Sequence, residues 1–523
     1  MRSTTFALAL LALAGCGGHR IAAHPSPDAG PRDDAGPLDD AGPLSADMAT
    51  PLDSGGRDAG APDAGPPIST HRLLEGVTLD GLAVFQGTRI GLASAGAAVP
   101  TRNAPVVALR DSLVRAYVTL STTRTVSAEL EVLEGGAVVA VHRATQVIAR
   151  STRDDDPTTA LDFRVPAAEL TTTASLRARL VDPAGTPETA APHPARLPRD
   201  GSALPLLAED DGRGLHLVLV PLRWDGDGSG RLPDTSTAWL DGVRALLLSL
   251  YPLVDLTLTV HAPVPWSDSL TLTGNVDFGS INAMLRDLRT TDGASNESYY
   301  YALVAPNATY SGYCGGSCVT GQSYVVDAAS DGGYRVGSGV DFGSADSAWT
   351  LAHEVGHEYG RYHAPCSTSG ADVGYPYAGG QIGVWGWDMR DGTFQAPVAT
   401  TDFMGYCDPT WISDYTWSAM FTRTLATSAL AHRAPERSLL VRLGAESVSA
   451  ERGAVLVGAR TLVPPTTRAR TRFAWLSRGR VLGSGDAPTL EVSDSNERLV
   501  VLPAPPALAD SVRLDGVVIA FAR

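Results

Sequence analysis

The segment from His353 to His363 reads HEVGHEYGRYH and limits most strongly what this chain of 523 residues can fold into. It matches the pattern H-E-x-x-H-x-x-G-x-x-H at every fixed position. On a helix, His353 and His357 are one turn apart and face the same way, so both imidazoles can reach one metal ion. Gly360 lets the helix end and turn, because glycine adopts left-handed conformations at little cost. The turn then brings His363 round as a third ligand.

Three neutral nitrogen ligands leave one coordination position open, as in catalytic rather than structural zinc sites. We therefore expect one Zn2+, bound by His353, His357 and His363. Zinc acidifies a water molecule in the open position, and Glu354, next to the first ligand, is expected to accept its proton and pass it to the departing amine. The motif thus predicts zinc-dependent hydrolysis of an amide bond.

The residues after the motif extend the pattern, because Asp402 to Cys407 reads DFMGYC. The long histidine motif followed by this methionine resembles the metzincin zinc metalloendopeptidases, in particular the secreted bacterial multidomain type. The resemblance implies that Met404 forms an apolar floor under the zinc without binding it. It also implies that Tyr406 approaches the zinc and stabilises the oxyanion. The alternative for Tyr406 is a packed ring with a hydrogen-bonded hydroxyl.

The resemblance covers roughly residues 213–430 and implies an α/β catalytic domain with a mixed sheet and an active-site helix. Within it, the residue pattern predicts a helix at 237–250, a helix near 281–288 and a buried strand at 299–304. By resemblance, the segment from Gly315 to Val325 is a glycine-rich turn and an edge strand above the active helix. An unpaired edge of this kind can bind an extended peptide by backbone pairing.

Aromatic side chains gather between residues 372 and 402. They either line the substrate cleft or pack in the core, and the sequence leaves both readings open. They are Tyr375, Tyr377, Trp385 and Trp387.

Short runs with strand-like alternation occupy both flanks of the catalytic part. Their spacing predicts β-sandwich domains at 71–212 and 431–523 around a zinc metalloprotease domain at 213–430. The expected fold class is therefore multidomain, with an α/β metzincin-like catalytic domain flanked by two β-sandwich domains. The first flank shows no aromatic platform for sugars, so a preference for glycosylated substrates has no support in the sequence.

Residues 1–16 are typical of a bacterial lipoprotein signal peptide. Arg2 precedes an apolar run at 6–14 that is too short to span a bilayer permanently. The segment ends in LAGC, which resembles a lipobox, so Cys16 is predicted to carry lipid; a secretory signal with an incidental cysteine is the alternative. Residues 17–70 repeat Asp-Ala-Gly-Pro and predict a disordered tether. We expect an exported envelope protein, at the outer membrane or cell surface, held to the membrane by its lipid.

Four cysteines follow Cys16, an even number that suits disulfides in an exported protein. Three pairings are possible. We favour Cys366 with Cys407, which joins the segment after the third histidine to the methionine turn, and Cys314 with Cys318, which closes the glycine-rich loop. A second zinc site made from these cysteines is the weaker alternative, because their spacing is loose.

The run from Asp225 to Gly230 resembles the start of a calcium loop. Its twelfth position is Ser236, where a bidentate glutamate is expected. Support for Ca2+ is therefore weak, and a solvated turn is the alternative.

The net charge of −16, from 41 basic and 57 acidic residues, makes nucleic acid a poor partner. Polypeptides are the substrates that the motif predicts, and the sequence does not indicate an oligomeric state. The alternative class of function is a catalytically silent surface adhesion protein that keeps the metalloprotease unit as a scaffold. The intact histidines and Glu354 argue against it.

Overall fold

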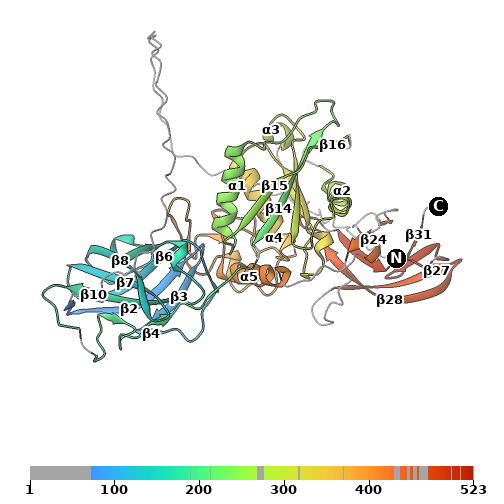
Figure 1. The fold of residues 1–523 in the computed structure, drawn as a ribbon. Coiled ribbons are helices and arrows are strands. Elements are labelled where there is room, and N and C mark those ends of the chain that lie inside the picture. Colours follow the sequence, from blue (N-terminus) through green and yellow to red (C-terminus); the bar gives the residue numbers. More distant parts are fainter. Residues whose placement is uncertain are drawn as a thin grey trace, which may run out of the picture.

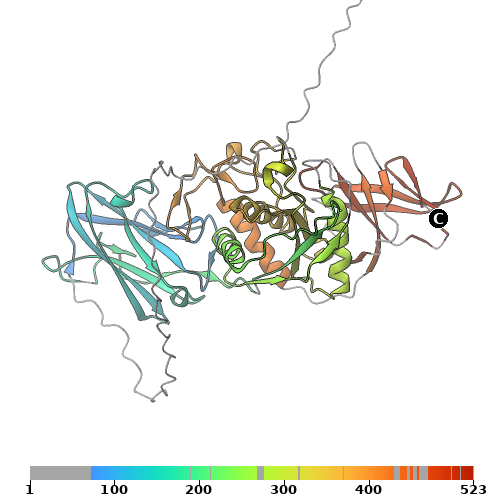
Figure 2. The ribbon, with the colours of Figure 1, turned by 90° about the horizontal axis from the view of Figure 1, so that it is seen from above.

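The computed structural model describes residues 72–521, apart from 189, 213, 268–275, 316–317, 369, 429–435, 444–447, 451–455, 459–468, 496, 504 and 507. Figure 1 and Figure 2 show three parts in a row, with most of the helices in the middle one. The predicted signal peptide, Cys16 and the tether at 17–70 lie outside the described residues. Among the described helices, none has both the length and the apolar run that crossing a bilayer requires.

The N-terminal part consists of two antiparallel sheets with short connecting elements. The first sheet contains β1 (Arg72–Leu73), β10 (Ser175–Asp182), β7 (Arg124–Glu134) and β8 (Ala137–Ile148), with β11 (Arg196–Leu197) and β12 (Leu204–Pro205) paired to β10. The second contains β4 (Ala97–Ala98), β3 (Arg89–Ser94), β2 (Val77–Phe85), β6 (Ser112–Leu120) and β9 (Leu161–Val165). The connections include the pair β5 (Val106–Val107) and β13 (Ala208–Glu209) and the short helices η1 (Pro157–Thr159) and η2 (Ala167–Glu169).

Buried residues of both N-terminal sheets, such as Leu82 and Leu130, belong to one apolar cluster. The predicted strand-rich character of this part is therefore confirmed. Its class as a β-sandwich and its boundary at 212 stay predictions.

The middle part is built on a mixed sheet in the order β15-β14-β17-β19-β18. The parallel strands are β14 (Leu215–Trp224), β15 (Leu256–Val260), β16 (Val264–Trp266), β17 (Ser298–Val304) and β19 (Val336–Val340), and β18 (Gly321–Ser323) is antiparallel to β19. All residues of β17 are buried, as expected for a parallel strand covered on both faces. The predicted strand at 299–304 is thus confirmed as β17.

The helices of the middle part are α1 (Thr237–Leu250), α2 (Phe278–Thr291), α3 (Tyr310–Tyr313), η3 (Gly332–Tyr334), α4 (Ala345–Glu358), η4 (Ala378–Gly380) and α5 (Asp414–Ser428). Side-chain caps begin the helices α1 to α4, whereas the short helices η3 and η4 begin without one. The helix predicted at 237–250 is confirmed with the same bounds. The helix predicted near 281–288 is longer, because Asp277 caps it at an earlier residue by accepting a hydrogen bond from the Ser280 amide at 3.0 Å.

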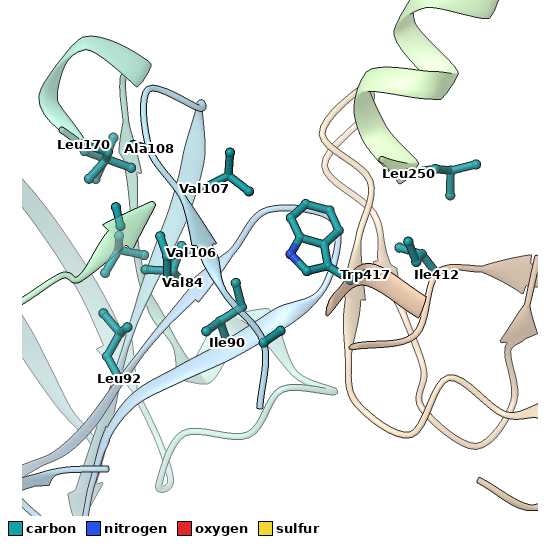
Figure 3. Packing of buried hydrophobic residues seen from close by; sticks show 14 of the residues in the cluster. Val84, Ile90, Leu92, Val106, Val107, Ala108, Leu170, Leu250, Ile412 and Trp417 are labelled. Atoms are coloured by element: carbon teal, nitrogen blue, oxygen red, sulfur yellow. The ribbon is translucent and has the colours of Figure 1, made fainter. Parts of the chain in front are cut away.

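Two short strand pairs follow α4, namely β20 (Gly386–Trp387) with β21 (Phe394–Gln395), and β22 (Thr401–Asp402) with β23 (Thr410–Trp411). Trp417 of α5 lies between the middle part and the N-terminal part, near Val107 on one side and Ile412 on the other (Figure 3). All three residues belong to the apolar cluster of the N-terminal sheets. The two parts therefore share one continuous core.

The C-terminal part is an antiparallel arrangement in the order β25-β24-β29-β28-β27-β30-β31, with β26 paired to β24. Its strands are β24 (Glu436–Leu443), β25 (Val448–Ala450), β26 (Leu456–Gly458), β27 (Arg470–Ser477), β28 (Arg480–Glu491), β29 (Arg498–Pro503), β30 (Ser511–Leu514) and β31 (Val517–Ala520). This flank is strand-rich as predicted, while its β-sandwich class and its boundary at 431 stay predictions. The turn after β28 reaches back to the middle part at β18 and α4.

Candidate metal centre

Helix α4 carries His353 and His357 on one face and ends where the motif predicts. Gly360 has φ +80°, and a Cβ atom there would lie 2.6 Å from the carbonyl oxygen of Val326. Glycine therefore supplies both the left-handed conformation and the close approach of two backbones. The turn brings His363 to the end of α4, so the predicted trio is assembled in space.

The Nε2 atoms of the three imidazoles converge. His357 Nε2 lies 3.1 Å from His353 Nε2 and 3.2 Å from His363 Nε2. His353 Nδ1 donates to the Phe403 carbonyl at 2.7 Å and His357 Nδ1 to the Arg361 carbonyl at 2.6 Å. Since a carbonyl only accepts, these two rings carry their protons on Nδ1, and their Nε2 lone pairs face the common centre.

Lone pairs that face one another in a buried place repel unless a cation lies between them. Burial lowers the pKa of His353, and it lowers the pKa of His357 well below its ordinary value. Both rings are therefore held neutral, which is the form that binds a metal ion. The donor set and the tautomers fit a zinc ion held by His353, His357 and His363.

A fourth potential ligand, Asp494, belongs to this cluster. One atom from each of the three histidines and Asp494 lies within 4.8 Å of the others, and Asp494 Oδ1 is 3.4 Å from His363 Nε2. Asp494 lies in the turn after β28, in the C-terminal part. Asp494 could not be predicted from the sequence, since no residue spacing links this turn to the motif.

Glu354 is buried beside the histidines. Its Oε2 accepts a hydrogen bond from Ser493 Oγ at 3.0 Å, and Gly321 of β18 packs against its side chain, because a Cβ there would lie 2.8 Å from Glu354 Cγ. Burial, and next the charge of Asp494, raises the pKa of Glu354 well above its ordinary value. A raised pKa suits a carboxylate that takes up and returns a proton.

Met404 lies under α4, where the resemblance places it. A Cβ atom on Gly356 would clash with the Met404 sulfur, so the thioether packs directly on the helix backbone. The Met404 amide donates to Asp402 Oδ1 at 2.9 Å, and its carbonyl accepts from the Ala364 amide at 2.9 Å. These bonds tie the methionine turn to the segment that carries His363.

Tyr406 also lies at the cluster. Its hydroxyl is 3.0 Å from His363 Nε2, and its ring lies 4.9 Å from the His363 ring. The backbone amide of Tyr406 donates to the Cys366 carbonyl at 3.1 Å. The hydroxyl is therefore close enough to act on a substrate bound at the histidines.

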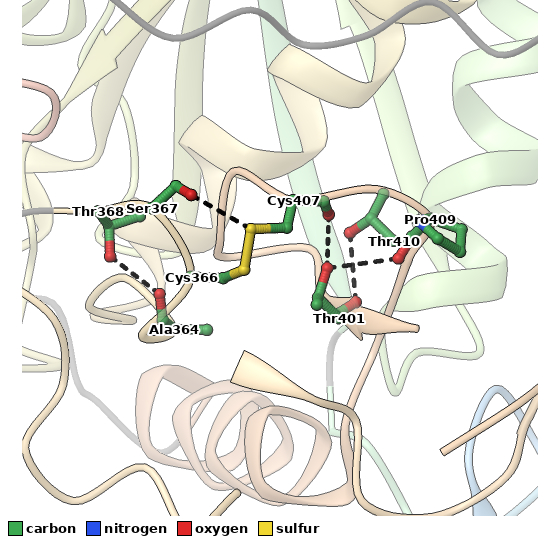
Figure 4. Close-up of a disulfide and its surroundings, with 8 residues drawn as sticks. All are labelled: Ala364, Cys366, Ser367, Thr368, Thr401, Cys407, Pro409 and Thr410. Carbon is green, nitrogen blue, oxygen red and sulfur yellow. Dashed lines mark hydrogen bonds between the residues drawn. A yellow bond between two sulfur atoms is a disulfide. The ribbon is translucent and has the colours of Figure 1, made fainter. Parts of the chain in front are cut away.

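Both favoured disulfides are confirmed. Cys314 pairs with Cys318, and Cys366 pairs with Cys407. Figure 4 shows the second bond beside Thr401, with Ser367 Oγ 3.5 Å from Cys407 Sγ. The Cys366–Cys407 bond thus joins the segment after His363 to the methionine turn.

In the suggested calcium loop, two carboxylates form ion pairs with arginines. Asp227 pairs with Arg231, and Asp225 pairs with Arg223. Hydrogen bonds from Ser229 and then Arg231 lower the pKa of Asp227 to about 2, although burial acts against them. Ser236 caps α1. The loop therefore matches the solvated-turn alternative, and Ca2+ stays a weakly supported prediction.

The aromatic residues between 372 and 402 pack rather than line a cleft. Trp387 is buried with Ala83, Phe85 and Leu113 of the N-terminal part, and Trp385 packs against the same cluster. The hydroxyl of Tyr375 donates to the Gln381 carbonyl and that of Tyr377 to Asp414. The core reading of these residues is the one that the structure favours.

The predicted edge strand is present but not open. β18 pairs with β19 on one side, and beyond its end Tyr324 pairs with Val492 of the C-terminal part. A cavity of about 220 Å³ remains beside the histidines, lined by His357, His363 and the turn after β28. The expectation of an unpaired edge is therefore wrong for the protein in this state.

The chain was compared with protein-family models and with curated proteins. A search of the curated proteins found no match. One segment of the middle part matches a protein-family model. The segment contains His353, Glu354, His357, His363 and Met404, and it leaves out both flanking parts and Asp494. It comprises residues 275–409, which match the model of Peptidase M66, a zinc metallopeptidase family.

Proposed function

We propose that this protein is a zinc-dependent endopeptidase of metzincin type that cleaves extracellular polypeptides. The observation that carries the proposal is the convergence of three Nε2 atoms beside a buried glutamate, with His357 Nε2 3.1 Å from His353 Nε2 and 3.2 Å from His363 Nε2. The family match at 275–409, which includes these residues, supports the same chemistry.

His353, His357 and His363 hold the metal in this proposal. Zinc, when bound, supplies a Lewis acid that polarises a peptide carbonyl and lowers the pKa of water. The carbonyl groups of Phe403 and Arg361 keep two of the rings in the ligating tautomer. Met404 keeps α4 at a fixed height by packing against Gly356.

Glu354 acts as the general base and then as the general acid. Its carboxylate takes a proton from the attacking water and delivers it to the nitrogen of the leaving amine, so the proton count balances over one cycle. The Tyr406 hydroxyl donates a hydrogen bond to the oxygen that becomes negative on the substrate carbonyl. Its position 3.0 Å from His363 Nε2 supports this role.

The first sixteen residues support the cellular part of the proposal. A lipobox-like end at Cys16 and a low-complexity segment at 17–70 suit a lipid-anchored protein that works outside the cytoplasm. Its substrates are then extracellular polypeptides, which it reaches from the membrane surface.

The test is to measure zinc content and casein cleavage for the wild-type protein and for Glu354→Gln. We expect about one zinc per chain in both proteins and a loss of cleavage of about 10²- to 10⁴-fold in the variant. Asp287→Asn, at an exposed residue of α2, is the matched control and should change neither quantity. A wild-type protein without bound metal, or a Glu354→Gln variant with unchanged cleavage, contradicts the proposal.

A further inference from the structure

The turn after β28 lies along the edge of the central sheet. The Val325 amide donates to the Glu491 carbonyl at 3.1 Å, and the Ser493 amide donates to the Ser323 carbonyl at 2.9 Å. Between these two bonds, Tyr324 and Val492 form an antiparallel bridge. Residues 491–493 therefore extend the sheet by one short strand.

This strand occupies the place where an extended substrate would pair. Each backbone amide donates one hydrogen bond, so the Val325 amide cannot serve Glu491 and a substrate at the same time. The other side of β18 is already paired with β19. Residues 491–493 and a peptide substrate thus compete for the same edge.

The same turn also reaches the reacting groups. Ser493 Oγ bonds Glu354, the proposed base, at 3.0 Å. The next residue, Asp494, brings Oδ1 to 3.4 Å from His363 Nε2 and completes a group of four potential ligands. Three nitrogen ligands with one carboxylate satisfy the four-coordinate preference of zinc and leave no position for water or substrate.

Buried apolar contacts hold the turn in place. Leu490, Val492 and Leu499 of the C-terminal part belong to the same cluster as Tyr324 and Val326. Val492 is 5% exposed. Release of the turn therefore requires these side chains to leave the middle part.

We propose that residues 491–494 of the C-terminal part form a built-in inhibitory segment, which covers the edge strand and places Asp494 on the metal. The inference rests on the proposed function and adds its regulation. The protein in this state is latent, and separation of the C-terminal part from the edge strand gives substrate access to Glu354 and the histidines.

The competing interpretation is that the turn forms a permanent wall of a working cleft, since it lines the cavity beside His357 and His363. A wall leaves the metal accessible. In contrast, the inhibitory segment blocks small ligands as well as peptides, and this difference can be measured without catalysis.

The test uses the full chain loaded with Co2+, with visible absorption as the readout and acetohydroxamic acid as the probe. Asp494→Gly removes the carboxylate and suits the backbone there, because Asp494 has φ +53°. We expect the variant to bind acetohydroxamic acid about 10- to 100-fold more tightly than the wild type, since one charge-assisted contact no longer has to be displaced. Asp515→Gly is the matched control, an exposed left-handed residue in another turn of the same part.

A second variant reaches the same state by another route. Val492→Asp keeps Asp494 but places a charge in a buried contact, which drives the segment off the edge strand. Tighter binding of the probe in both variants, with faster casein cleavage in the zinc-loaded proteins, supports the proposal. Unchanged probe affinity in both variants, or slower cleavage by Asp494→Gly with metal still bound, overturns it.

The double variant Asp494→Gly/Glu354→Gln separates this inference from the proposed function. Tighter probe binding without cleavage in the double variant supports both. If Asp494→Gly binds the probe more tightly but cleaves no peptide even with Glu354 intact, the segment is inhibitory towards ligands and the endopeptidase assignment fails. If none of the variants binds metal, the proposed function fails at its first step and the inhibitory segment fails with it.

Discussion

The middle part of the molecule meets its two neighbours through different kinds of contact. Towards the N-terminal part, the Trp417 ring packs on the backbone of Gly87, and its ring N–H donates to the Pro105 carbonyl at 3.1 Å. The Trp411 ring N–H donates to the Gly87 carbonyl at 2.7 Å. Arg110 extends across the boundary and donates to carbonyls at the end of α1. None of these residues is a potential metal ligand or the proposed base.

Towards the C-terminal part, the contacts run to the reacting groups themselves. Ser493 bonds Glu354, and Asp494 joins the histidines. Among the described residues of the C-terminal part, only a small set of side chains around Val492 belongs to the apolar cluster that it shares with the middle part. The first boundary therefore stabilises the catalytic part, while the second covers the place where substrate would bind. The first is expected to persist during function and the second to open.

The largest effect is expected at the N-terminal boundary. Trp417→Ala removes a fully buried ring from the shared core, so the free energy of unfolding of the first two parts should fall by about 3–5 kcal/mol. Calorimetry or urea unfolding of the full chain measures it. Trp475→Ala, in the separate core of the C-terminal part, is the matched variant. It should lower the midpoint of a different unfolding transition. If both variants lower the midpoint of the same unfolding transition equally, the C-terminal part does not unfold separately from the first two parts.

A smaller loss of stability is expected for Arg110→Met. The buried guanidinium donates to the carbonyls of Tyr251 at 3.0 Å and Leu253 at 2.5 Å. Methionine keeps the apolar stem but removes the Arg110 donor from both carbonyls, of which Tyr251 keeps the Leu253 amide as a donor at 2.8 Å. The loss should cost about 2–3 kcal/mol of unfolding free energy. Arg472→Met, at an exposed arginine of the C-terminal part, is the control and should change stability by less than about 0.5 kcal/mol. Equal effects of the two substitutions would show that Arg110 is not a fixed element of the boundary.

At the C-terminal boundary, Val492→Ala should weaken docking rather than folding of the catalytic part. The loss of two methyl groups from a buried contact costs about 1–2 kcal/mol, which favours the open state by roughly 5- to 30-fold. The opening is measured by limited proteolysis of the full chain and by the rate of casein cleavage. The exposed Val518 offers a matched Val518→Ala control. A variant that unfolds the catalytic part without raising cleavage would contradict the view that this boundary is releasable.

The smallest effect is a shift in the pH profile. A general base works in its ionised form, so cleavage should rise with pH through the pKa of Glu354. Burial raises that pKa first and the charge of Asp494 raises it next. Asp494→Gly removes the charge, and release of the segment gives Glu354 more contact with water, so both changes lower the pKa of Glu354. The rise of kcat/KM should therefore move to lower pH. A rise that stays in place, or moves to higher pH, would show that Asp494 does not act on Glu354.

The histidine site could be read from the sequence because it is local. His353, Glu354 and His357 lie on one helix, and Gly360 brings His363 within one turn, so helical geometry alone determines the cluster. Met404 and Tyr406 came from the resemblance; in the structure Met404 packs against α4 at Gly356, and the Tyr406 hydroxyl lies beside His363. The helix at 237–250 and the strand at 299–304 were predicted for the same reason, since their periodicity reflects burial along one element.

Asp494 and Ser493 could not be predicted, because they reach the site through the packing of a separate part of the chain. Their approach depends on β28, on the bridge between Tyr324 and Val492, and on the small cluster around Val492. No residue spacing encodes such a contact. The expectation of an open edge strand was wrong for the same reason, since the partner that covers Tyr324 is distant in sequence.

The zinc-edge X-ray absorption spectrum of the full wild-type chain after zinc loading tests directly whether the histidines and Asp494 bind one metal ion. We expect a four-coordinate metal with three nitrogen ligands at about 2.0–2.1 Å and one carboxylate oxygen, with the carboxylate signal lost in Asp494→Gly. A spectrum without histidine ligands, or one in which Asp494→Gly leaves the wild-type spectrum unchanged, would contradict it.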